Sequence, residues 1–304
     1  MATAFGVLPA SFAHADVAEL SRRAEWTDWH ADPVLLLTLT LAAWTYVRGL
    51  ARYWLLGGRE IGPWHAAAFA GGLASIALAL LSPVDAASDQ LAAAHMVQHM
   101  LLAAVAAPLV VLGAPGLVCL WGLPDASRRD LARIWTRLRL RRLPWSHWRS
   151  PRTGWLLFAL TLWAWHLPAL YSAAVRTPAV HDLQHLSFFG AGCLYWRSLL
   201  DPVSRFRLSG SAAALSLFGT TLHSTILGAF MTLAPVPWYG DFEGRTGWWG
   251  LTPLEDQQLA GLIMWMPACV PYLLAAAVLL GRSLSRESPA VSMPMRPALR
   301  GGSG

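Results

Sequence analysis

The chain contains no lysine, and only 13% of its 304 residues are charged. With 55% hydrophobic residues, this composition lies outside the range of ordinary soluble domains and predicts a membrane protein. All 23 basic residues are arginines, and they lie between apolar segments instead of forming one basic face. The net charge of +6 therefore indicates membrane topology, and we expect no nucleic-acid partner.

Cysteine is also scarce, because Cys119, Cys193 and Cys269 are the only three and each lies in a different apolar stretch. No CxxC pair is present, which excludes a disulfide framework, a thiolate zinc site and covalent haem attachment through CxxCH. We expect the three cysteines to be small buried hydrophobic residues. The amino terminus lacks the basic leading region of a signal peptide, which argues against cleavage after Ala15.

Long apolar segments are abundant, and each is long enough to cross a bilayer core, which requires about 20 residues. The seven segments run over 33–51, 63–82, 92–121, 154–174, 181–200, 211–233 and 255–281. The third segment is unusually long, so we expect Pro108 to kink it and Gly113 with Pro115 to end its regular part. The sequence predicts an all-α polytopic membrane protein with seven transmembrane helices.

The loops between these segments alternate in charge. Arginines are concentrated in the first, third and fifth connections and in the tail, whereas the intervening loops are acidic or nearly neutral. By the positive-inside rule, the amino terminus is predicted outside and the carboxyl terminus in the cytoplasm. We therefore expect an extracytoplasmic segment (1–32), a seven-helix membrane domain (33–282) with an Arg-rich cytoplasmic loop (122–153), and a cytoplasmic tail (283–304). Within this loop, 125–150 fits either an amphipathic helix on the inner leaflet or a solvated basic loop.

Histidines are concentrated near the predicted outer surface of the membrane domain. Two pairs are spaced four residues apart, one in AHMVQHMLL and one in VHDLQHL, so each pair lies on one helix face. Single histidines occur in the fourth and sixth segments. The six candidate metal ligands are His95, His99, His166, His181, His185 and His223. Because polar groups in hydrocarbon are costly, six histidines at one depth indicate a shared metal or haem site.

Other polar and sulfur-containing side chains lie at the same level. Asp182 and Asp256 are candidates to accept the second ring N–H of a ligating histidine, which orients the ring. Gln98 is a further supporting candidate beside the first histidine pair. Met96 and Met100 offer thioethers that suit Cu(I), although methionines in such a stripe more often serve packing.

The histidines alone leave the cofactor open. Imidazole-rich ligation suits copper, zinc or iron. Paired histidines on two antiparallel helices also suit axial ligation of haem b, which would make a redox membrane protein. Zinc with Asp256 would instead suggest a membrane hydrolase that activates water.

Several longer motifs resemble the CtaG family of caa3-type cytochrome c oxidase assembly factors. They are HMVQHMLL (95–102) running on to APLVVLGAP, WHLPALYSAAV (165–175), VHDLQHLSFFGAGCLYW (180–196), LGAFMTLAPVPWY (227–239) and LEDQQLAGLIMW (254–265). The resemblance covers the third to seventh segments, about two thirds of the chain. Several motifs matching in the same order make it specific.

The resemblance implies a non-enzymatic bacterial protein of the cytoplasmic membrane that supports copper supply to a haem-copper oxidase. The family's histidine motifs correspond here to the six histidines named above. Expected partners are cytochrome c oxidase subunits, other copper chaperones and the lipid bilayer. Combining this with the predicted topology, we expect copper to be held in an outward-facing intramembrane cluster in which His99 and His185 lie close enough to bridge one metal.

Overall fold

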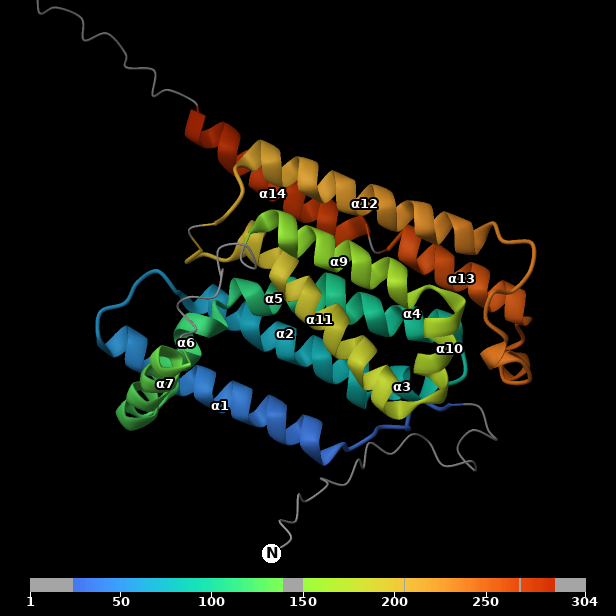
Figure 1. Cartoon of the computed structure of the whole chain (residues 1–304), viewed down its shortest axis with the longest axis horizontal. Helices are drawn as coiled ribbons and strands as arrows, with labels where there is room; N and C mark the ends of the chain where they lie inside the picture. The colour runs from blue at the N-terminus through green and yellow to red at the C-terminus, as the bar shows by residue number, and fades with distance from the viewer. Residues whose placement is uncertain (1–23, 139–149, 205, 268, 288–304) are drawn as a thin grey trace, which may run out of the picture.

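The computed structural model describes residues 24–138, 150–204, 206–267 and 269–287, and every regular element in these ranges is helical. The helices of the first half are α1 (Pro33–Leu55), α2 (Pro63–Leu81), α3 (Pro83–Ser88), α4 (Ala92–Met100), η2 (Leu101–Ala106), α5 (Ala107–Leu112), α6 (Pro115–Gly122) and α7 (Asp125–Arg137). Those of the second half are α9 (Pro151–Trp165), α10 (Pro168–Arg176), α11 (Pro178–Leu200), α12 (Gly210–Thr232), η4 (Gly240–Phe242), η5 (Thr246–Trp249), α13 (Pro253–Trp265) and α14 (Cys269–Glu287). Figure 1 shows the long helices packed side by side, with α1 at one edge and α12 at the other.

Proline begins most of these helices, since its fixed φ suits the first turn and its missing N–H has no helical partner there. Side-chain caps add to this signal. The Asp32 carboxylate accepts hydrogen bonds from the Val34 and Leu35 amides at the start of α1. At the start of α13, Thr252 and Glu255 form a capping box.

Five helical stretches are long and apolar enough to cross a membrane, or six if the bent pair α9 and α10 counts as one span. This bend of 77° follows the Trp-His-Leu-Pro break within the predicted segment 154–174. The predicted segment 181–200 corresponds to α11, whose 23 residues are sufficient in length but include polar side chains near its start. The protein is therefore an all-helical membrane protein, while the count of seven spans and the orientation of the termini stay predictions.

The long third segment is divided, as its prolines and glycine predicted. After α4 the chain forms a π-helix, η2, and then α5, which carries Pro108 in its first turn. This stretch ends at Gly113, and Ala114 adopts a left-handed conformation with φ 48° before α6. The break redirects α6 toward α1, so the helical stretch that is long and apolar enough to span ends at Leu112 and does not continue to residue 121.

The contact between α1 and α6 depends on two glycines. A Cβ on Gly49 would lie 1.9 Å from the Val118 carbonyl oxygen, and a Cβ on Gly122 would lie 2.1 Å from the Thr45 carbonyl oxygen. Because α1 packs chiefly on α6 and only slightly on α2, it is held to the bundle mainly at one end. The stretch 125–150, which fitted either an amphipathic helix or a solvated loop, is helical over α7, and residues 139–149 lie outside the described ranges.

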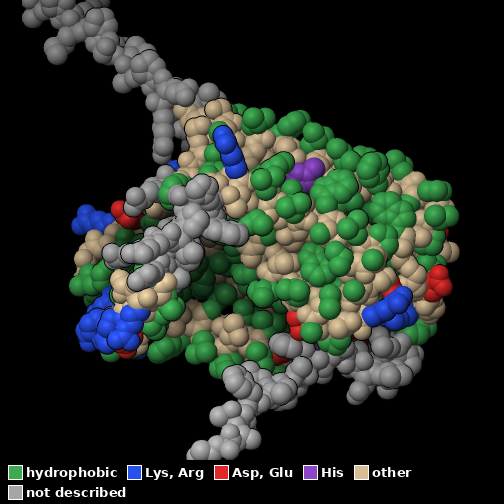
Figure 2. Space-filling model, in the orientation of Figure 1, with side chains coloured by type: hydrophobic (Ala, Val, Ile, Leu, Met, Phe, Trp, Pro, Cys, Tyr) green, Lys and Arg blue, Asp and Glu red, His purple; other side chains and the backbone are tan. Residues whose placement is uncertain are grey.

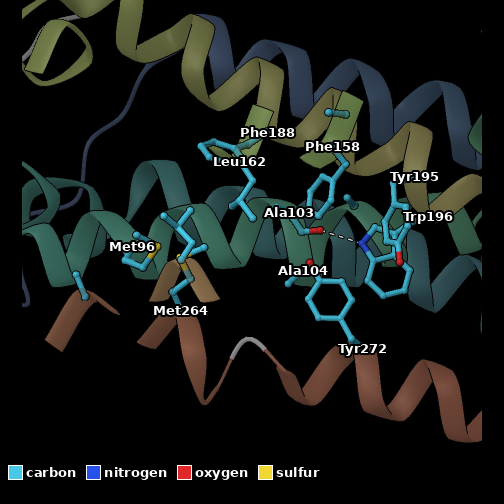
Figure 3. Close-up of a cluster of buried hydrophobic side chains, with 14 of the residues drawn as sticks. Met96, Ala103, Ala104, Phe158, Leu162, Phe188, Tyr195, Trp196, Met264 and Tyr272 are labelled. Carbon is cyan, nitrogen blue, oxygen red and sulfur yellow. Dashed lines mark hydrogen bonds between the residues drawn. The ribbon is translucent and has the colours of Figure 1, made fainter. Parts of the chain in front are cut away.

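The main core lies among α4, η2, α9, α11, α12, α13 and α14. The Trp196 indole N–H donates to the Ala103 carbonyl in the π-helix at 3.0 Å, and Tyr272 stacks on Trp196 (Figure 3). These contacts fix α11 against η2. Cys119, Cys193 and Cys269 are free and only partly buried, where we expected full burial.

Candidate functional site

Both predicted histidine pairs lie together between α4 and α11. Ring centroids are 4.3 Å apart for His95 and His99, and 4.2 Å apart for His181 and His185. Across the two helices, His95 lies 5.0 Å from His181, and His99 lies 5.5 Å from His185. We call these four residues the histidine cluster. Each pair shares a helix face because four residues make about one turn.

The two histidines of α4 are the most deeply buried part of the histidine cluster. His95 is 1% exposed and His99 is 0% exposed, and neither the Nε2 atom of His95 nor either ring nitrogen of His99 has a hydrogen-bond partner. Phe188 packs 4.5 Å from the His99 ring, and Tyr171 lies 5.2 Å from the His95 ring. Buried nitrogens without partners carry a free-energy cost, so they are the atoms a bound cation would satisfy.

The geometry brings imidazoles together but does not form a finished metal site. No group of three or more histidine, cysteine, aspartate or glutamate side chains within the described ranges is positioned to hold a metal ion. A metal lies about 2 Å from a ligating nitrogen, so two ligating rings have centroids on the order of 4 to 6 Å apart. The spacing of the four rings fits this range, and ring rotation would be needed to converge their nitrogens.

The two single histidines pack against other aromatic rings. His166 caps the end of α9, where its Nδ1 lies 2.7 Å from the Leu162 carbonyl oxygen, and its ring is 6.4 Å from Phe188. His223 lies in α12 with its ring 5.8 Å from Trp155. Among the described residues, no ring contact joins His166 or His223 to the four clustered rings. The ring contacts therefore join four of the six predicted ligands, and His166 lies close enough to His95 and His99 to interact with them electrostatically.

Asp256 was predicted to support a histidine ring, and the hydrogen bonds found for it among the described residues join it to backbone amides. Its carboxylate is 1% exposed and accepts hydrogen bonds from the Ala92 amide at 2.7 Å and the Ala93 amide at 3.0 Å. Because α4 has no side-chain cap of its own, this carboxylate from α13 caps it. Asp256 thus positions the helix that carries His95 and His99.

Gln98 joins α4 to its neighbours on the side of Asp85. Its Nε2 donates to the Asp85 Oδ1 at 2.6 Å and to the Ala79 carbonyl at 2.9 Å. Burial and the nearby Asp89 raise the pKa of Asp85 to about 7. Gln98 therefore anchors α4 to α2 and α3.

The two methionines belong to the packing of the bundle. Met96 is 0% exposed and lies next to Met264 in the main core, as Figure 3 shows. Met100 packs against the same core. Their placement agrees with the packing interpretation of this stripe.

Sequence reasoning did not single out Gln184 or Tyr171. The Gln184 carboxamide is fully buried in α11 close to His95, and neither of its polar atoms has a hydrogen bond of ordinary geometry. The Tyr171 hydroxyl is likewise buried without a partner. Gln184 lies three residues after His181, so helical spacing could have identified it.

A cavity of about 530 Å³ adjoins the histidine cluster, with His181 and His185 in its wall. Asp182, the remaining predicted supporting residue, lines this cavity together with Asp85. The cavity extends between α1, α2 and α11. The cluster therefore borders a space large enough for solvent or a small ligand.

Comparison with known proteins identifies the family of this chain. A family model described as cytochrome c oxidase caa3 assembly factor (Caa3_CtaG) matches residues 44–286. Uncharacterized proteins of Mycobacterium bovis and Mycobacterium tuberculosis are each 25% identical over 223 residues, covering 68% of this chain. The chain spans about a third, 32%, of the length of these curated relatives. No solved structure matches. The matched range includes every residue of the histidine cluster, and the chain belongs to the family of cytochrome c oxidase caa3 assembly factors.

Proposed function

We propose that this assembly factor binds copper at the histidine cluster and supports maturation of the copper centre of the oxidase. The observation that carries the proposal is the mutual contact of four buried imidazoles from two helices, with the Nε2 of His95 and both ring nitrogens of His99 lacking hydrogen bonds. Imidazole is a common copper ligand. The unpartnered ring nitrogens of His95 and His99 are costly to bury unless a ligand satisfies them.

The charge of the site favours the monovalent ion. The four imidazoles are neutral ligands, and the free-energy cost of burying an ion rises with the square of its charge. Cu(I) is therefore the better match than a divalent ion. The copper is cargo, acquired from the outer aqueous phase and passed to an oxidase subunit by ligand exchange. Rings that are near each other but not converged on one point suit a site that must also release its metal.

The two alternatives fit the described residues less well. Axial ligation of haem needs a flat slot between two histidines, whereas His95 stacks on His181 at 5.0 Å. The zinc hydrolase alternative requires Asp256 as a base, and this carboxylate already accepts two backbone hydrogen bonds from α4. Copper binding by these imidazoles therefore remains the proposal with the best structural support.

Paired substitutions test the proposal. The purified parent protein should bind copper in an anaerobic titration against a chromogenic Cu(I) chelator, with no haem Soret band in its visible spectrum. His95→Gln with His99→Gln, and separately His181→Gln with His185→Gln, should abolish this binding. Met96→Leu and His223→Gln are matched controls, because both lie outside the histidine cluster, and they should bind as the parent does.

A second readout follows the oxidase in cells. Each histidine pair variant should lose oxidase activity while the oxidase subunits are still synthesised. Full copper stoichiometry in both pair variants, each still monodisperse in detergent, would refute the intramembrane site. Normal oxidase activity in both would refute its role in maturation.

A further inference from the structure

The cavity beside the histidine cluster is a feature that copper binding alone does not use. It lies between α1, α2 and α11, where α1 is held to the bundle mainly through α6. Figure 1 shows α1 at the edge of the bundle below α2 and α11, and Figure 2 shows that this face of the molecule is hollowed, with hydrophobic walls. One side of the cavity is apolar, with leucines from α1, α2, η2 and α11 and with Phe189.

The other side of the cavity is polar, and its charge has one sign. The polar lining consists of His30, Asp32, Thr38, Asp85, His181, Asp182 and His185. Three of these are carboxylic acids, and no arginine is among the described lining residues. A cavity lined by one sign of charge with low-dielectric walls concentrates ions of the opposite sign. The polar end is therefore built for a cation.

The position of the acids links the outside to the histidine cluster. Asp32 precedes α1 and Asp85 lies in α3, so both are outside the helical stretches long enough to span. Asp182 directly follows His181 near the start of α11. His181 and His185 belong both to the cavity wall and to the cluster, so an ion in the cavity is already beside the first rings it would bind.

We propose that this cavity is a water-filled, cation-selective vestibule through which metal ions reach the histidine cluster from the predicted outer side. A volume of about 530 Å³ at a polar site accommodates on the order of ten water molecules. A copper ion would shed its water stepwise here, with Asp85 and Asp182 offsetting its charge until His181 and His185 replace the water. The copper identity of the ion rests on the proposed function, whereas water access and charge selectivity do not.

Cysteine accessibility tests the vestibule without copper. Leu39 lines the cavity, whereas Leu37, on the same helix, is 60% exposed on the outside of the bundle and does not line it. At pH 8, Leu39→Cys should react with a cationic methanethiosulfonate at least about tenfold faster than with an anionic one, the lower end of the range for electrostatic focusing. Leu37→Cys should react slowly with both, and the parent, with its three partly buried cysteines, gives the background.

The carboxylates must account for this selectivity. Asp85→Asn with Asp182→Asn should bring the two reagent rates on Leu39→Cys together, whereas Glu243→Gln, an exposed acid outside the cavity, should leave the ratio unchanged. If Leu39→Cys reacts no faster than Leu37→Cys, a lipid chain fills the cavity and the vestibule is refuted. Equal rates for the two reagents in the parent background would refute cation selectivity.

A copper-loading time course then separates the vestibule from the histidine cluster. The double asparagine variant should load at least about tenfold more slowly than the parent yet reach the same final stoichiometry, because its histidines are intact. An unchanged loading rate would refute the vestibule as the route of entry. A parent that binds no copper would refute the proposed function, while the labelling ratio would still decide whether the vestibule exists.

Discussion

Removing the Asp256 carboxylate should loosen the helix that carries half of the histidine cluster. Asp256→Ala deletes two buried hydrogen bonds, at 2.7 and 3.0 Å, to the first amides of α4. A hydrogen bond to a charged group contributes about 1.5–3 kcal/mol, and two bonds to one carboxylate are not fully additive, so we expect a loss of about 3 kcal/mol. At roughly 2–4 °C per kcal/mol, the apparent Tm should fall by about 6–12 °C.

Thermal unfolding of the purified protein in detergent measures this effect. Asp256→Asn retains one acceptor oxygen and should lose less than the alanine variant. Glu255→Gln is the matched control, because Glu255 is the exposed neighbour that caps α13 itself through Thr252. His95 lies one turn into α4, so copper affinity should fall in Asp256→Ala and stay unchanged in Glu255→Gln. A drop in Tm below about 2 °C for Asp256→Ala, or an equal drop for Glu255→Gln, would contradict the capping role.

Two further predictions concern Asp85 and the α1–α6 contact. The folded state raises the pKa of Asp85 from 3.8 to about 7, so the free energy of unfolding should fall by up to about 4 kcal/mol as the pH rises from 4 to 7. Asp85→Asn should flatten this part of a curve of Tm against pH. A curve for Asp85→Asn parallel to that of the parent would contradict this. Gly49→Ala must separate α1 from α6 and should cost about 1–3 kcal/mol in thermal unfolding, whereas Gly116→Ala, in open space on α6, should cost nothing. Equal Tm values for these two variants would rule out the close contact.

The helices could be located from the sequence because apolar length and proline are local signals. Predicted segments 33–51, 63–82 and 211–233 correspond closely to α1, α2 and α12. The break at Pro168 was present in the sequence as Trp-His-Leu-Pro, but residues 154–174 were predicted as one transmembrane helix. A proline can either kink a helix or end it and begin a new one. The sequence signal is the same in both cases, and tertiary packing decides the outcome.

The candidate site was predictable only in its pairs. His95 with His99 and His181 with His185 follow from spacing on one helix, because such pairs lie on the same face wherever the helix goes. Which helices face each other is a tertiary property, so which of the six rings contact one another could not be read from depth alone. For the same reason Asp256 was given a histidine partner, although its position beside the α4 amides depends on how α13 packs.

The π-helix at Leu101–Ala106 begins two residues after His99. A π turn contains one residue more than an α turn, and each residue of an α-helix turns the chain by about 100°. The extra residue therefore rotates the side chains of the histidine-bearing half about the helix axis, relative to the side chains of the half that follows Pro108. The latter half packs against α2 and α11 through small and branched side chains, while the former directs its imidazoles at α11. The two halves of this helix can thereby each turn the side chains that they need toward their neighbours, which an uninterrupted α-helix could not do for both halves together.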